Sequence, residues 1–372
     1  MLLSGIVQAS QFSFLTPSDD RWQYPFNFTP GTRAVASCFG SPGTPDFNDR
    51  DGIIIVAWNT SGSLPPSQGA DAYGVKSVTV RLTSQKGSAW PTDLTVDEWF
   101  TYDANGDDVL NADGIPRGQV GDTDGESDDE DLGRTIELFG AGFGSFYSPQ
   151  TWTENSLFIG SASDANVPRD PFPFVFQEGT WERLHVEDNV KGLHNDQLAQ
   201  PVIKFTPVPW AIGKPVGYVP GNQPVPFEVI FEVDLDLSAG HVRHYFQEQL
   251  DQGRLFVVVT SLKEAAIQGA QSGFPTFFTK EGAAFDLAAE APRLDLHACL
   301  AVAPDFDRDC DVDAFDVQHF EACRTGPAVG PPGSECLNSD FDHDWDVDQE
   351  DFAILQRCFS GPDAEPDPGC AS

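Results

Sequence analysis

The chain is poor in basic residues and in long apolar runs, and each shortage narrows what the protein can do. Only 21 Lys and Arg residues stand against 58 Asp and Glu residues among 372, which gives a formal net charge of −37. A surface this acidic repels phosphate backbones and anionic lipid headgroups, so it argues against nucleic-acid binding. No run of about 18 apolar residues occurs, so we expect no membrane-spanning helix. The same charge attracts cations, and calcium is a hard cation that carboxylate oxygens suit.

Cysteine is scarce along most of the chain and concentrated at its end. Six of the seven Cys residues follow position 298, which indicates a small disulfide-stabilised unit from an oxidising compartment. Residues 1–10 contain a short apolar run but lack the basic segment of a signal peptide. We therefore expect a secreted, extracellular or cell-surface protein, on the basis of cysteine usage and composition, with an incomplete export signal.

Residues 1–297 have the pattern of a β-rich domain. Short alternating or β-branched runs are separated by clusters of Pro, Gly, Asn and Asp, and they occur at residues 52–58, 76–82, 202–205, 227–237 and 255–262. Residues 241–250 have helical spacing of apolar side chains, and Gly253 is a helix stop. The sequence predicts a mainly β protein whose N-terminal domain is a large β-sandwich or jelly roll.

Residues 298–372 contain an internal duplication with a 35-residue offset. Residues 305–316 (DFDRDCDVDAFD) and 340–351 (DFDHDWDVDQED) both carry Asp at loop positions 1, 3, 5, 7, 9 and 12 and Val at position 8. A loop wrapped around one Ca²⁺ presents side chains from positions 1, 3 and 5, a carbonyl from 7, often a water-mediated contact from 9, and a closing carboxylate from 12. The predicted metal ligands are Asp305, Asp307, Asp309, Asp311, Asp313 and Asp316, and Asp340, Asp342, Asp344, Asp346, Asp348 and Asp351. We expect Val312 and Val347 to pin the two loops together through a short β-like contact.

Each loop is followed by a predicted helix, at residues 317–324 and 352–359, and then by a Gly-Pro stop. No comparable apolar helix precedes either loop, so these are loop–helix halves. This pattern, with Asp at position 12, resembles the dockerin domain of bacterial secreted modular proteins, with calcium loops of the EF-hand type. The resemblance covers residues 305–362 and implies a small α-helical domain of two calcium loop–helix repeats, with Ca²⁺ as cofactor and a cohesin-like protein as partner.

Two departures from the dockerin pattern concern specific positions. Position 6, normally Gly, is Cys310 in one loop and Trp345 in the other, and a left-handed backbone there costs about 1–2 kcal/mol. Positions 10 and 11, which in dockerins help to contact cohesin, differ strongly between the repeats, so the family's dual binding mode is not expected. These positions are Ala314–Phe315 and Gln349–Glu350.

The cysteines of the repeat have matched spacing. Cys323 and Cys358 follow position 12 by the same distance, and Cys336 and Cys370 follow them by 13 and 12 residues. This spacing suggests the disulfides Cys323–Cys336 and Cys358–Cys370, while Cys299 can pair with Cys310. Cys38 is then left free or intermolecular.

Weaker signals lie in the large domain. Asp103, Asn105, Asp107 and Asn111 begin like a third calcium loop, although an ordinary surface loop has the same composition. No catalytic motif stands out. Glu98 and Glu182 are the first candidates for a glycosidase carboxylate pair. His241 and His244 lie three residues apart on the predicted helix, and we interpret them as ordinary surface residues.

The resemblance to dockerins favours a non-catalytic binding or scaffold role in a polysaccharide or cell-surface context. The partner would be a cohesin-like or other extracellular protein, or a glycan. Two alternatives stay open: a dockerin-borne glycoside hydrolase with catalysis in the N-terminal domain, and a calcium-stabilised structural or adhesive protein. A large interface that covers the two helices would favour the structural alternative.

Overall fold

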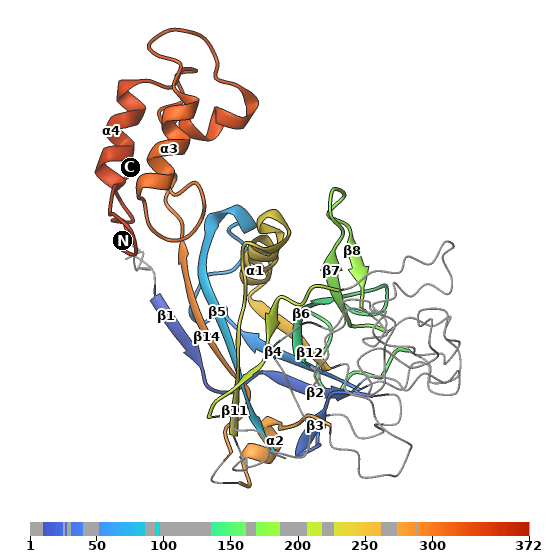
Figure 1. Cartoon of the computed structure of the whole chain (residues 1–372). Helices are drawn as coiled ribbons and strands as arrows, with labels where there is room; N and C mark the ends of the chain where they lie inside the picture. The colour runs from blue at the N-terminus through green and yellow to red at the C-terminus, as the bar shows by residue number, and fades with distance from the viewer. Residues whose placement is uncertain are drawn as a thin grey trace, which may run out of the picture.

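Two antiparallel sheets that share one apolar core form the larger part of the structure (Figure 1). The computed structural model describes residues 10–24, 27, 31–39, 52–85, 94, 96, 135–160, 169–186, 207–217, 227–261, 274–286 and 289–371. The prediction of a mainly β protein with a sandwich architecture is confirmed. Among the described residues, no helix combines the length and the apolar character needed to cross a bilayer.

The first sheet is built around the long strand β5. Its order is β1 (Ser10–Phe14), β14 (Arg293–Leu300), β5 (Tyr73–Ser84), β11 (Phe227–Glu232) and β10 (Lys214–Pro215), with β13 (Thr276–Phe278) paired to β5 and to β3 (Val35–Ser37). β11 begins where the sequence predicts but ends at Glu232, before a 3₁₀ helix at Leu237–Gly240. The predicted strand at residues 202–205 lies outside the described residues.

The second sheet has the order β2 (Asp19–Gln23), β4 (Ile53–Asn59), β12 (Arg254–Ser261), β6 (Ile136–Gly142), β7 (Phe172–Phe176) and β8 (Arg183–His185), with β9 (Ala211–Ile212) paired to β6. The centre of this sheet is covered on both faces. Alternate residues of β4, such as Ile54, enter the shared core, while Ile55 packs with Trp152 in a second cluster. This explains why β4 is an almost continuous apolar run.

Helix α1 (His241–Asp251) packs into the core of the sandwich beside β5 and β12. It buries Val242, Tyr245, Phe246 and Leu250, the apolar positions of the predicted helix. Gly253 follows with a φ of 74°, the left-handed conformation expected of a glycine stop. A short helix, α2 (Lys280–Ala283), follows β13.

The C-terminal unit projects beyond the end of the sheets (Figure 1). It contains α3 (Ala314–Cys323), a 3₁₀ helix at Ser334–Ser339 and α4 (Gln349–Cys358). Each α-helix begins three residues before the predicted start, because Asp313 and Asp348 form capping boxes with Asp316 and Asp351. A small core that includes Val312, Phe320, Val347 and Leu355 lies between the two repeats.

Three disulfides confirm the predicted pairing. They join Cys299 to Cys310, Cys323 to Cys336 and Cys358 to Cys370. Cys38 is free and fully buried in the sandwich core. It is therefore inaccessible to another chain, which leaves the intermolecular alternative without support.

Candidate metal centre

The two Asp-rich loops fold into the same backbone conformation. Positions 4 and 6 are left-handed in both: φ is 61° at Arg308 and 74° at Cys310, and 63° at His343 and 76° at Trp345. Position 6 thus adopts the turn that usually requires glycine, although neither loop has one. The matching strain in both loops indicates that the surrounding contacts hold each loop in this shape.

The first and last carboxylates of each loop organise its backbone. Asp305 accepts hydrogen bonds from the backbone N–H groups of Asp309 and Cys310, at 3.2 and 3.1 Å. Asp316 accepts bonds from the N–H groups of Phe306 and Asp313, at 2.7 and 2.8 Å. The closing carboxylate therefore ties the beginning of the loop to the beginning of helix α3.

The second loop repeats this arrangement at the equivalent residues. Asp340 accepts a bond from Trp345 N–H at 3.1 Å. Asp351 accepts bonds from Phe341 N–H and Asp348 N–H, at 2.6 and 2.9 Å. The duplication in the sequence is thus a duplication of hydrogen bonds.

Carboxylate oxygens converge at two places in each loop. Positions 1, 3 and 12 form one group and positions 7, 9 and 12 another, and the participating oxygens of each group lie within 4.8 Å of one another. The groups are Asp305, Asp307 and Asp316; Asp311, Asp313 and Asp316; Asp340, Asp342 and Asp351; and Asp346, Asp348 and Asp351. The position-5 side chains lie outside these groups: Asp309 and Asp344 each accept a bond from the backbone N–H two residues later, at 3.1 and 3.2 Å.

Burial, with a smaller contribution from neighbouring negative charges, disfavours the ionisation of these carboxylates. Burial, assisted by the charge of Asp316, raises the pKa of Asp305 to about 7. Burial and the charge of Asp309 raise the pKa of Asp307 to about 6, and burial raises that of Asp316. Burial also raises the pKa values of Asp342 and Asp351 in the second loop. A cation among these oxygens would favour the ionised forms, because an opposite charge lowers a carboxyl pKa.

The residues fit a hard divalent cation. Every group supplies carboxylate oxygens alone, the ligand type that calcium and magnesium prefer. Asp340 Oδ1 and Asp346 Oδ1 are buried and have no hydrogen-bond partner among the described residues. Burying a carboxylate oxygen without a partner costs free energy, so these two oxygens of the second loop are free to bind an ion.

The two repeats hold each other through the residues that follow each helix. Val312 bonds Ser360 in both directions: its N–H donates to Ser360 Oγ at 3.0 Å, and its carbonyl accepts from Ser360 N–H at 3.0 Å. Val347 has the same relation to Thr325, at 2.9 and 3.0 Å. The prediction that these valines pair with each other through β-like bonds is therefore wrong, because their backbone groups bond the end of the opposite repeat. Their side chains do share one core.

The position-7 carboxylates add further hydrogen bonds to the chain that follows the helices. Asp311 Oδ2 accepts a bond from Asp363 N–H at 2.8 Å, and Asp346 Oδ2 accepts one from Ala328 N–H at 2.5 Å. In Asp346, one carboxylate oxygen makes this contact, while Oδ1 has no hydrogen-bond partner among the described residues.

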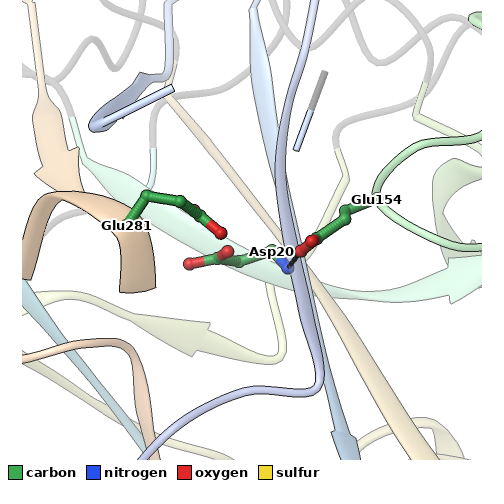
Figure 2. Close-up of side chains that lie close together, drawn as sticks. All are labelled: Asp20, Glu154 and Glu281. Carbon is green, nitrogen blue, oxygen red and sulfur yellow. Dashed lines mark hydrogen bonds between the residues drawn. The ribbon is translucent and has the colours of Figure 1, made fainter. Parts of the chain in front are cut away.

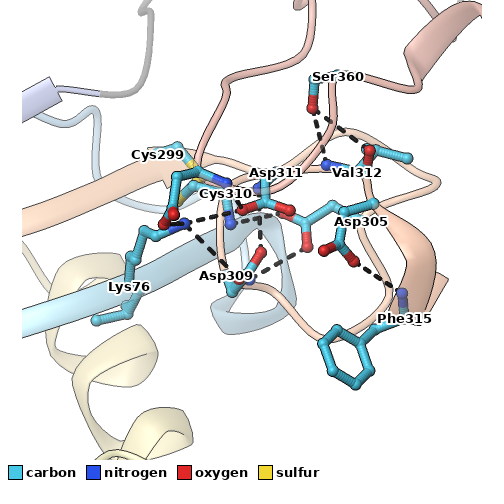
Figure 3. A network of polar contacts seen from close by, with 12 residues as sticks. Lys76, Cys299, Asp305, Asp309, Cys310, Asp311, Val312, Phe315 and Ser360 are labelled. Atoms are coloured by element: carbon cyan, nitrogen blue, oxygen red, sulfur yellow. Dashed lines mark hydrogen bonds and ion pairs between the residues drawn. A yellow bond between two sulfur atoms is a disulfide. The ribbon is translucent and has the colours of Figure 1, made fainter.

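The first loop is joined directly to the sandwich (Figure 3). The Cys299–Cys310 disulfide links β14 to position 6, and Val75 N–H of β5 donates to Arg308 O at 2.8 Å. A Cβ at Gly74 would lie 2.6 Å from Cys299 Sγ, so glycine is needed for the disulfide to lie against β5.

Lys76 of β5 adds an ionic contact to this junction. Its Nζ lies 2.8 Å from Asp311 and 3.8 Å from Asp309 (Figure 3). It also lies 3.0 Å from Asp363. Sequence reasoning missed Lys76, since nothing in the β5 pattern distinguishes this residue. It also missed the roles of Thr325 and Ser360, although their equal places in the two repeats offered a signal.

The weaker predicted sites have different outcomes. Asp103, Asn105, Asp107, Asn111 and Glu98 lie outside the described residues. His241 stacks on Trp181, with ring centroids 4.5 Å apart, and His244 lies 3.6 Å from Glu248. Glu182 is exposed, and its candidate partner in a glycosidase pair is Glu98, one of the residues outside the described part of the chain.

An aromatic hollow lies beside Trp181, with a volume of about 630 Å³. Phe176, Trp181 and Trp210 line it, and Glu178 is the one carboxylate among the described residues of its wall. An apolar hollow with few polar groups is typical of a small-molecule site.

The two loop–helix repeats of the chain are similar to each other. This similarity extends from the Asp spacing to the capping boxes and the left-handed residues. No protein-family model matches the chain, and no curated protein matches it.

Proposed function

We propose that residues 298–372 form a dockerin-like, calcium-stabilised attachment domain of a secreted protein whose role is non-catalytic binding. The observation that carries this proposal is the pair of equivalent loops in which acidic side chains converge on common centres. Calcium would neutralise each centre and order its loop, so that folding of the small domain and metal binding are coupled.

The outer surface of the two helices supports attachment to a partner. Phe315 is 70% exposed, Phe359 is 52% exposed and Phe352 is 37% exposed, so apolar side chains remain uncovered by the sandwich. A groove of about 380 Å³ lies between the helices, with Phe320 and Phe352 in its wall. Exposed aromatic side chains beside a groove support a protein-interaction surface here. A cohesin-like or other extracellular protein is the partner that the dockerin resemblance implies.

The structural alternative has one observation in its favour, the covalent and ionic junction at the first loop. That junction reaches Cys310 and the Asp311 side chain. It leaves the outward faces of α3 and α4 exposed, which a purely structural unit would not require. Attachment therefore remains the function that the geometry favours.

A glycan-related role of the sandwich is supported by the aromatic hollow. Sugar rings stack on exposed aromatic faces, and Trp181 lies in its wall. Hydrolysis would require two carboxylates about 5–9.5 Å apart, whereas the described wall contains one, Glu178. The aromatic wall thus supports glycan binding in this hollow.

Calcium titration of the full chain tests the metal part of the proposal. We expect calorimetric heat and a gain in helical circular dichroism, both reduced in the Asp305→Ala plus Asp340→Ala protein. The matched control is Glu335→Ala plus Glu365→Ala, which removes two exposed carboxylates of the same unit. Absence of heat and of spectral change in the unaltered chain would contradict calcium binding.

Attachment is tested with a panel of cohesin-type proteins and soluble cell-wall glycans. We expect binding in calcium that is abolished by a chelator and weakened at least tenfold by Phe315→Ser plus Phe352→Ser. Phe285→Ser is a suitable control, because Phe285 is 88% exposed and lies in the sandwich. Equal binding by the helix variant and the control would contradict the proposed surface.

A further inference from the structure

Three carboxylates from distant parts of the sandwich meet beside β2 (Figure 2). Asp20 lies on β2, Glu154 lies in the segment after β6, and Glu281 lies on α2. One oxygen from each is within 4.8 Å of the other two. The site is separate from the C-terminal loops and shares no residue with them.

Asp20 is buried and has an oxygen without a partner. The residue is 1% exposed; Oδ2 accepts a bond from Lys280 N–H at 2.7 Å, and Oδ1 has no hydrogen-bond partner among the described residues. Glu281 Oε2 is also buried and without a partner there. Figure 2 shows the Asp20 and Glu281 carboxylates turned toward one another. Two buried, unsatisfied carboxylate oxygens in one place call for a positively charged partner.

One positive charge is already present beside the group. Lys280 Nζ forms an ion pair with Glu154, lies 4.0 Å from Glu281 Oε1 and donates a hydrogen bond to Ser18 O at 2.8 Å. Three carboxylates against one ammonium leave two negative charges. The charge that remains matches one divalent ion.

We propose that Asp20, Glu154 and Glu281 bind one hard divalent cation, calcium or magnesium, in the sandwich. Carboxylate oxygens are the ligands that both ions prefer, and water completes the coordination of each. The ion joins β2 of one sheet to α2, which follows β13 of the other sheet. Binding therefore fastens the two sheets to each other at this end of the molecule.

The test counts bound ions in the full chain by equilibrium dialysis at about 1 mM free Ca²⁺, the range of extracellular modules, and separately in Mg²⁺. The background is the Asp305→Ala plus Asp340→Ala protein, which is impaired in both C-terminal loops. We expect Asp20→Asn plus Glu281→Gln in that background to lower the count by one ion per chain. Failure of the C-terminal loops to bind calcium in the unaltered chain leaves this difference intact.

The matched control in the same background is Glu232→Gln plus Glu290→Gln, which removes the same charge from side chains that are 65% and 70% exposed. An equal ion count in the site variant and the control, in both Ca²⁺ and Mg²⁺, would overturn the proposal. Because Asp20→Asn can impair folding, Glu281→Gln alone is measured as well. The thermal midpoint of the background protein should rise on addition of the ion and rise less with Glu281→Gln; no rise in either protein would also overturn the proposal.

Discussion

Replacing Lys76 with methionine should have opposite effects on the metal-free fold and on calcium binding. Methionine keeps an unbranched apolar chain and removes the ammonium group that lies among Asp309, Asp311 and Asp363. Burial lowers the pKa of Lys76, but its bonds to Asp311 and Asp363 outweigh that effect and raise the pKa above the ordinary value. The folded protein thus stabilises the charged lysine.

The loss of stability follows mainly from Asp311. Its side chain is 4% exposed, whereas that of Asp363 is 85% exposed, so the bond to Asp311 carries most of the effect. Hydrogen bonds to charged groups contribute about 1.5–3 kcal/mol, and we expect a loss in this range in chelator. Urea unfolding, followed by tryptophan fluorescence and circular dichroism, measures it. Lys214→Met is the control, since the Lys214–Glu232 pair is exposed and should contribute less than about 1 kcal/mol.

Calcium binding at the first loop should become tighter in the same variant. The ammonium of Lys76 lies 3.8 Å from Asp309 and repels a divalent ion in the adjacent loop, so its removal should raise the calcium affinity roughly fivefold, equivalent to about 1 kcal/mol. Calorimetry in an Asp340→Ala plus Glu281→Gln background isolates the first loop from the second loop and from the carboxylate group beside β2. Stability equal to that of Lys214→Met, or weaker calcium binding, would refute the electrostatic account of this junction.

Three further predictions concern the same unit. In chelator, the contribution of Asp305 to stability should be complete below about pH 4 and lost as pH rises through 7, because its pKa is raised from 3.8 to about 7 in the folded state. Urea unfolding midpoints measured across this pH range test the expectation. Asp305→Asn should flatten the dependence of the midpoint on pH. Cys358→Ser plus Cys370→Ser opens a cross-link between residues 12 apart and should cost about 3 kcal/mol, measured as a lower denaturant midpoint; an unchanged midpoint would contradict a structural role. Thr325→Val leaves the Val347 N–H without its hydroxyl acceptor and should cost about 1–3 kcal/mol, with faster amide exchange at that residue, whereas Thr180→Val at an exposed turn should be neutral.

Much of the fold could be predicted from local patterns. The continuous apolar run of residues 52–58 and the helical spacing of residues 241–250 correspond to β4 and α1, because burial requires those periodicities. The disulfides within the repeats followed from the similar spacing of their cysteines, 13 and 12 residues. The early end of β11 could not be predicted, since acidic residues on alternate positions also suit a longer strand.

The candidate metal centre was predictable within each loop but not between loops. Position numbering placed positions 1, 3 and 12 together, as in the groups that contain Asp305 and Asp340, but it also placed position 5 there, which the groups do not include. The exchange of bonds between Val312 and Ser360 depends on how the repeats pack, which the spacing of residues does not encode. The ionic contact of Lys76 and the convergence of carboxylates at Asp20 depend on long-range tertiary contacts, so no local sequence motif predicts either one.

The junction at Cys310 also affects how a partner bound to the C-terminal unit would be oriented relative to the sandwich. Four residues separate the end of β14 from Asp305, and the disulfide shortens that connection further. A flexible tether lets two bound bodies search for each other and sets their effective concentration by its reach. Here a partner bound to the C-terminal unit would instead be held in a fixed orientation relative to the sandwich. That orientation, and not the length of a tether, would decide which parts of the partner the sandwich can contact.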